Sequence, residues 1–148
     1  MKEREEVLIV ITSRAAAKYP ASVLTKGSTP TKPIALIVDD ETDICYLLKD
    51  ILQRKFQSIA VNSLAEAKRY LQANEPTLIF LDNKLSDGFG MDHIHLFKEI
   101  YPSMKIIMIT ASDNFEDKEK ALDEGADYFI NKPFSVKTIL EGIERIDL

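Results

Sequence analysis

The chain has 148 residues, of which 45% are hydrophobic and 29% are charged, so it suits one globular domain with some additional length and excludes two full domains. Its formal net charge at pH 7 is −5, but residues 1–32 carry +3 and the remainder −8. Nucleic acid phosphates are bound through clustered Lys and Arg. The acidic remainder therefore argues against nucleic acid as a direct partner and favours a metal ion or a basic protein surface.

The cysteine content and the apolar segments bear on location. Cys45 is the single cysteine, so it has no partner for an internal disulfide, and we expect it to be a small buried helix residue. The apolar run 7–11 is too short for a membrane span or for the core of a secretory signal. We therefore predict a cytoplasmic protein without membrane insertion.

Residues 1–32 are predicted to be an N-terminal extension or linker. The stretch GSTPTKP at 27–33 has the composition of turns and extended coil, which places the start of the folded domain near Pro33. Two interpretations of the extension remain open. Residues 7–12 form a short strand that joins a sheet edge, here or in a neighbouring chain, or the whole extension is loosely ordered.

From Pro33 onward, apolar runs alternate five times with amphipathic helical stretches. Continuous apolar runs are typical of strands that are covered on both faces, and strict alternation implies a parallel sheet with helices on both sides. Helix ends are marked by a capping box at Ser63 and Glu66, by Gly125, and by Ser135. The expected strands are 34–38, 58–62, 77–81, 105–110 and 127–130, with helices at about 44–52, from 63, at 91–101, at 115–124 and from 135.

Polar residues collect where these predicted strands end. Asp39 and Asp40 follow the first strand, and Asp82 follows the third. Thr110 ends the fourth strand, and Lys132 follows the fifth. Because the carboxyl ends of parallel strands face one edge of the sheet, three carboxylates, a hydroxyl and an amine are expected to converge there.

This set of side chains suits phosphoryl transfer. Crowded carboxylates repel one another and need a cation, and hard oxygen ligands favour Mg²⁺. Asp82 is then positioned to act as a nucleophile that forms an aspartyl phosphate. Thr110 would donate a hydrogen bond to a phosphoryl oxygen, and Lys132 would pair with its charge.

Residues 33–148 resemble the receiver domain of two-component response regulators, in the single-domain form of the chemotaxis regulators. The resemblance rests on four motifs in order at four strand ends: VDDE, DNKLSDGFG, TAS and NKPF. It implies a flavodoxin-like (βα)5 fold, an α/β three-layer sandwich with strand order 2-1-3-4-5. It also implies a cis peptide bond between Lys132 and Pro133.

The resemblance assigns roles to particular residues. Asp82 would be the phosphoacceptor. Asp40 would bind Mg²⁺ directly and Asp39 largely through water, and the backbone carbonyl of Lys84 would be a further ligand. The phosphoryl donor would be a histidine kinase or a phosphotransfer protein. The protein would not be an enzyme, although it would assist its own phosphorylation and dephosphorylation.

Thr110 and Lys132 would be catalytic together with Asp82, and Thr110 and Phe129 would form the switch. Phe129 stands where the family often has Tyr, so a switch here would act by packing alone. A further departure is Ser86, in a loop position where the family usually has Pro. Lys84 and Ser112 occupy positions that tune how fast the family's members lose the phosphoryl group.

Three functions are compatible with this pattern. The first is a stand-alone receiver that signals to an unidentified downstream protein through the face of the fourth helix, fifth strand and last helix. It is favoured because the sequence given ends at Leu148, directly after the last helix. The second is a phosphorylation-independent interaction module with the same fold. The third, an aspartate-nucleophile phosphatase of the haloacid dehalogenase type, normally needs a second Asp where Lys84 stands.

Overall fold

The computed structural model describes residues 31–148, and residues 32–148 form one compact unit. The strand expected at 7–12 and nearly all of the extension lie outside the described residues, so the boundary near Pro33 stays a prediction. Within the described part, five parallel strands form the main sheet in the order β2-β1-β3-β6-β7. These are β1 (Ile34–Val38), β2 (Gln57–Val61), β3 (Leu78–Asp82), β6 (Lys105–Thr110) and β7 (Tyr128–Asn131).

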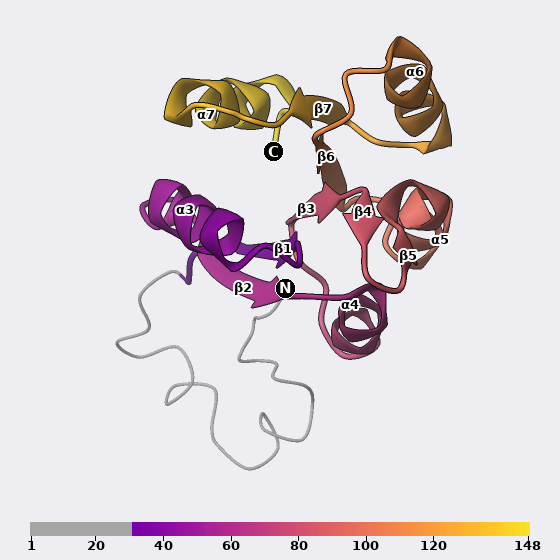
Figure 1. The fold of residues 1–148 in the computed structure, drawn as a ribbon. Coiled ribbons are helices and arrows are strands. Elements are labelled where there is room, and N and C mark those ends of the chain that lie inside the picture. Colours follow the sequence, from indigo (N-terminus) through magenta and orange to yellow (C-terminus); the bar gives the residue numbers. More distant parts are fainter. Residues whose placement is uncertain (1–30) are drawn as a thin grey trace. The chain divides into compact units, whose positions relative to one another are not determined.

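This arrangement confirms the predicted α/β flavodoxin-like fold, since the five strands lie in the order 2-1-3-4-5 when they are counted along the chain. The helices cover the sheet in two layers (Figure 1). None of those in residues 31–148 combines the length and the apolar character that a membrane crossing needs. One layer contains α3 (Thr42–Leu52) and α7 (Val136–Arg145), and the other α4 (Leu64–Leu71), α5 (Ile94–Ile100) and α6 (Phe115–Glu124).

Side chains alternate between the two faces of each strand, so each helix layer packs against its own hydrophobic core. Leu36 and Val38 of β1 pack on the side of α4, α5 and α6, whereas Ala35 and Ile37 pack on the side of α3 and α7. β3 is buried along its whole length. Because both faces of the central strands are covered, every position must be apolar, and this explains the continuous apolar runs in the sequence.

Local hydrogen bonds set the helix ends much as expected. The Ser63 hydroxyl accepts a hydrogen bond from the Glu66 amide at 3.1 Å. The Glu66 carboxylate accepts from the amide of Asn62 at 2.9 Å, so this capping box closes one residue earlier than the standard pattern. Gly125 ends α6 with a φ of 118°, a conformation that favours glycine. Ser135 caps α7 through the amide of Thr138 at 3.1 Å.

The segment after β3 has more structure than the loop that the sequence predicts. Two short antiparallel strands, β4 (Lys84–Leu85) and β5 (Gly88–Phe89), form a hairpin there. The helix expected at 91–101 begins with a 3-10 turn, η1 (Gly90–His93), before α5. The apolar periodicity is the same in both helix types over one turn, so the sequence does not separate them.

Gly90 sits where this hairpin meets the end of β3. An added Cβ would collide with the backbone carbonyl oxygen of Asp82 and would lie 2.9 Å from Cγ of Leu81. We predict that Gly90→Ala lowers the free energy of unfolding by roughly 2–3 kcal/mol, because backbone and core atoms must shift. Urea denaturation checks this, with Ser86→Ala at an exposed position of the same loop as the control. Equal stability of the two variants would contradict the prediction.

Candidate functional site

The register of the sheet aligns the ends of its strands in one row. Val38 of β1 lies beside Leu81 of β3, so the next residues along these strands, Asp39 and Asp82, are neighbours. Thr110 pairs with Asn131, directly before Lys132. The result is a cleft lined mainly by polar residues: Asp40, Glu41, Asp82, Asn83, Lys84, Thr110, Ser112, Asp117 and Lys132.

Three carboxylates form the acidic part of this cleft. Each of Asp39, Asp40 and Asp82 offers an oxygen that lies within 4.8 Å of the other two. Asp39 and Asp82 are buried and Asp40 is exposed. Lys84 lines the same edge as Asp40. Oxygen donors at this spacing, with one side open to solvent, could hold a hard divalent cation.

The ammonium group of Lys132 is the centre of the charge pairs in the cleft. Its Nζ lies 2.6 Å from Oε1 of Glu41, 2.9 Å from Oδ2 of Asp39 and 3.5 Å from Oδ1 of Asp82. Burial acts to lower the pKa of Lys132, but the hydrogen bonds with Glu41 and Asp39 and the charge of Asp82 outweigh burial and raise that pKa. Lys132 is therefore a fixed positive charge in this cleft.

Burial has the opposite consequence for the carboxylates. It raises the pKa of Asp82 to about 6, with a further contribution from the negative charge of Asp39 that Lys132 only partly offsets. Burial also raises the pKa of Asp39, against the hydrogen bonds from the Glu41 amide and Lys132. The single positive charge of Lys132 does not neutralise both buried carboxylates. Binding of a further positive charge would therefore stabilise the site.

Thr110 is connected to the start of α6. Its buried side chain accepts a hydrogen bond through Oγ1 from the amide of Ser112 at 3.3 Å. The Ser112 hydroxyl donates to Oδ2 of Asp117, in the first turn of α6, at 2.8 Å. The side chain of Asn131 donates to the Ser112 carbonyl. Movement of Thr110 would therefore act on α6 through two hydrogen bonds.

Phe129 and Tyr128 point to opposite faces of β7. Phe129 is buried in the core on the α6 side, and Tyr128 packs on the α7 side. The peptide bond between Lys132 and Pro133 is cis, which agrees with the expectation. Of the predicted site residues, Phe129 alone does not lie at the strand ends with the polar group.

Sequence reasoning gave no role to two residues that the structure brings to the site, Glu41 and Asp117, or to Asp87 in the adjacent hairpin loop. Glu41 pairs with Lys132, and Asp117 bonds to Ser112. Asp87 accepts the amides of Leu64 and Ala65 at 3.0 and 2.9 Å and so ties the hairpin loop to α4. Glu41 stands next to the acidic pair in the sequence, but its partner is 91 residues away, so no local pattern could reveal the contact.

Comparison with known proteins places this fold and site in one family. Residues 35–144 match the family model described as the response regulator receiver domain. The chain therefore belongs to the response regulator receiver family. The match covers the five strands of the main sheet, except for Ile34 at the start of β1, and the polar residues at their ends.

Individual relatives agree with this assignment. The chain is similar to the phosphate regulon transcriptional regulatory protein PhoB of Escherichia coli, at 34% identity over 117 residues, covering 75% of this chain and 50% of that protein. It is 32% identical over 112 residues to the heme response regulator HssR of Staphylococcus saprophyticus, with the same coverage. The chain thus spans about half the length of these relatives.

A solved structure supports the fold independently of these sequences. The response regulator receiver domain protein (CheY-like) from Methanospirillum hungatei aligns with a TM-score of 0.74 and 30% identity. The alignment covers 79% of this chain and 95% of that one. The core receiver architecture is therefore shared at nearly full length with that structure.

The raised pKa of Asp82 predicts a pH-dependent gain in stability for Asp82→Asn. The pKa of Asp82 is about 6 in the folded state and 3.8 in the unfolded state. The ionised carboxyl therefore lowers the free energy of unfolding above pH 6, and this loss disappears as the pH falls from 6 to below 3.8. In a chelating buffer at pH 8, we expect the variant to be about 1–3 kcal/mol more stable than wild type.

Denaturation in urea at several pH values measures this difference, which should shrink steadily between pH 7 and pH 4. Asp43→Asn, at an exposed position in the first turn of α3, is the control and should differ little from wild type throughout. A variant at Asp82 that is less stable than wild type at pH 8 would contradict the prediction.

Proposed function

We propose that this chain is a receiver that accepts a phosphoryl group on Asp82 from a histidine kinase or a phosphotransfer protein, in a reaction that depends on Mg²⁺. The observation that carries the proposal is the position of the Asp82 carboxylate at the cleft, beside Asp39, Asp40 and the ammonium of Lys132. The buried free cysteine, Cys45, is compatible with a cytoplasmic location.

The transfer uses the ionised carboxylate as the nucleophile. An oxygen of Asp82 attacks phosphorus, the bond from phosphorus to the donor breaks, and the leaving group keeps the electron pair. A pKa of about 6 leaves most of Asp82 ionised at pH 7 to 8. Asp82 thus has the charge state that the reaction requires, without a separate general base.

Neighbouring residues stabilise the charge that arrives with the phosphoryl group. Asp39, Asp40 and Asp82, with the backbone carbonyl of Lys84, would hold Mg²⁺. When bound, the ion supplies positive charge that offsets the repulsion between carboxylates and phosphoryl oxygens. Lys132 pairs with one phosphoryl oxygen, and the Thr110 hydroxyl donates a hydrogen bond to another. The chain would act as a phosphoacceptor that assists its own phosphorylation and dephosphorylation rather than as an enzyme.

We expect wild type, incubated with acetyl phosphate and Mg²⁺, to gain the mass of one phosphoryl group. Asp82→Asn should show no gain, because the amide nitrogen and oxygen are poor nucleophiles, and wild type with excess EDTA should gain far less than with Mg²⁺. Intact-mass spectrometry under non-acidic, rapid conditions measures all three.

Other outcomes distinguish other functions. Equal gain in wild type and Asp82→Asn would place the phosphoryl group elsewhere. No gain with several small donors would favour a phosphorylation-independent interaction module. Sustained phosphate release from unrelated phosphoesters would favour a phosphatase of the aspartate-nucleophile type.

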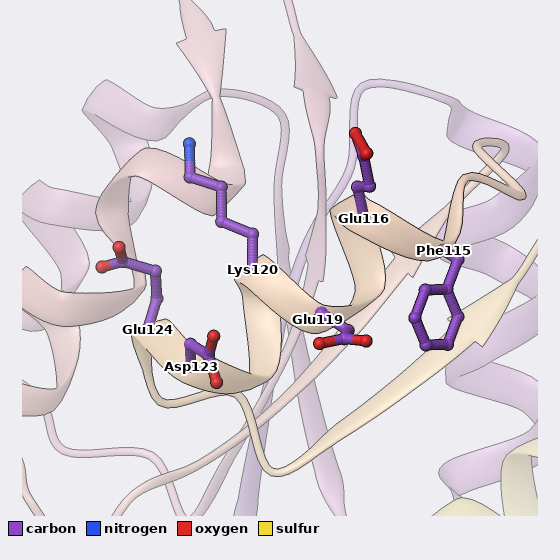
Figure 2. Close-up of a pocket in the computed structure, with 6 residues that line it drawn as sticks. All are labelled: Phe115, Glu116, Glu119, Lys120, Asp123 and Glu124. Carbon is purple, nitrogen blue, oxygen red and sulfur yellow. The ribbon is translucent and has the colours of Figure 1, made fainter.

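The output surface is proposed to be the face of α6, β7 and α7. α6 contains five acidic and two basic residues, and its only buried residue is Ala121. Phe115, at the start of α6, has 69% of its surface exposed. The α6 part of this surface presents an aromatic ring at one end and mostly acidic groups along its length, which suits a protein partner with basic groups. Figure 2 shows side chains that project from α6: Phe115, Glu116, Glu119, Lys120, Asp123 and Glu124.

Phosphorylation would reach this surface through Thr110. When the Thr110 hydroxyl turns toward a phosphoryl oxygen, its bond to the Ser112 amide is lost, and the Ser112–Asp117 hydrogen bond to α6 is strained. Space vacated by Thr110 would be filled by the Phe129 ring, so the signal is a change of packing. The partner would bind the two arrangements with different affinities.

Beryllofluoride with Mg²⁺, a phosphoryl mimic, is predicted to shift the backbone amide resonances of Ser112, Asp117 and Phe129 in NMR spectra. The same addition to Asp82→Asn should leave these resonances in place, because the mimic needs the carboxylate oxygen. Binding of the mimic to wild type with shifts confined to the strand ends, and none in α6 or β7, would contradict the proposed switch.

A further inference from the structure

Glu41 makes the shortest of the charge contacts that Lys132 forms. The distance from Oε1 of Glu41 to Nζ of Lys132 is 2.6 Å, against 2.9 Å to Asp39 and 3.5 Å to Asp82. The Lys132 side chain is only 12% exposed, whereas that of Glu41 is 60% exposed. An ammonium that is nearly buried is thus held most closely by a carboxylate on the solvent side of the cleft.

The local backbone directs Glu41 to this position. Glu41 is the N-cap residue of α3, yet its side chain makes no capping hydrogen bond. Its amide donates to Oδ1 of Asp39 at 2.8 Å, which fixes the start of the helix beside the acidic pair. The carboxylate is then free to reach across to Lys132.

The Glu41–Lys132 ion pair is not needed for the stability of the fold. Asp39 and Asp82 are buried, so each needs the ammonium of Lys132 as compensation. Glu41 is largely exposed, and water would satisfy its carboxylate equally well. The contact therefore has little effect on the free energy of folding, but it holds the Lys132 ammonium toward Glu41 in competition with Asp39 and Asp82.

We propose that Glu41 is a positioning residue that restrains Lys132 on the solvent side of the cleft and thereby slows phosphorylation of Asp82. This inference rests on the proposed function. As the phosphoryl group forms its bond to an Asp82 oxygen and the donor leaves with the electron pair, negative oxygens collect beside Asp82. Lys132 must turn from Glu41 to pair with them, so loss of the Glu41 contact lowers the barrier.

The test compares Glu41→Gln with Asp43→Asn, using acetyl phosphate as donor and acetate as the leaving group, at saturating Mg²⁺. The two changes remove the same charge, but Asp43 is exposed in the first turn of α3 and is absent from the residues paired with Lys132. We expect Glu41→Gln to raise the maximal phosphorylation rate about threefold or more and Asp43→Asn to leave it unchanged.

Two further measurements separate restraint of Lys132 from simple repulsion of the donor. Repulsion would alter the half-saturating concentration of acetyl phosphate and would be screened by salt, whereas restraint of a nearly buried ammonium alters the maximal rate and persists at high ionic strength. Glu41→Asp keeps the charge but shortens the side chain, so it should also be faster than wild type. Thermal unfolding of all variants should agree closely.

The results distinguish a failure of the proposed receiver function from a failure of the role proposed for Glu41. If wild type gains no phosphoryl group, the proposed function fails. If wild type is phosphorylated, the receiver function stands. The role of Glu41 is then overturned if the maximal phosphorylation rate of Glu41→Gln does not exceed that of wild type and of Asp43→Asn. It is also overturned if the higher rate of Glu41→Gln disappears in high salt.

Discussion

The charge balance around Lys132 is the constraint on which the site depends. Two buried carboxylates, Asp39 and Asp82, share one ammonium with the exposed Glu41, and the ammonium does not neutralise them fully. Burial raises the pKa of both aspartates as a result. The cleft would thus gain free energy from added positive charge, which is what the proposed function requires of a site that binds a cation.

The parallel sheet makes this concentration of charge possible. Its strands present consecutive polar residues at one edge, while the apolar residues before them are covered on both faces and fix the strands in register. Deep burial of β1 and β3 means that the aspartates cannot move apart to relieve their repulsion. The energy that holds the carboxylates together therefore comes largely from the two hydrophobic cores, while Lys132 offsets part of the repulsion within the site.

The proposed coupling to a distant surface would use the same geometry. Thr110 is the last residue of β6, and the connection to α6 passes through the Ser112 amide and the Asp117 carboxylate. α6 is held to the core by few apolar contacts, with Ala121 as its one buried residue. A weakly held helix beside a rigid sheet is the element on which a small change at Thr110 acts most easily. In the response regulator receiver family, this chain would therefore combine a rigid acceptor site with a compliant output helix.

The sequence by itself determined the strand and helix order, the parallel sheet and the polar residues at strand ends, because burial on both faces demands continuous apolar runs that a sequence displays directly. Asp39, Asp40, Asp82, Thr110 and Lys132 were found in this way. Only the tertiary structure decided the β4–β5 hairpin, the capping of α4 by Asp87 and the pairing of Glu41 with Lys132. The hairpin is local but too short to show a strand period, whereas the Asp87 and Glu41 contacts join segments 23 and 91 residues apart, and no local periodicity encodes such a partner.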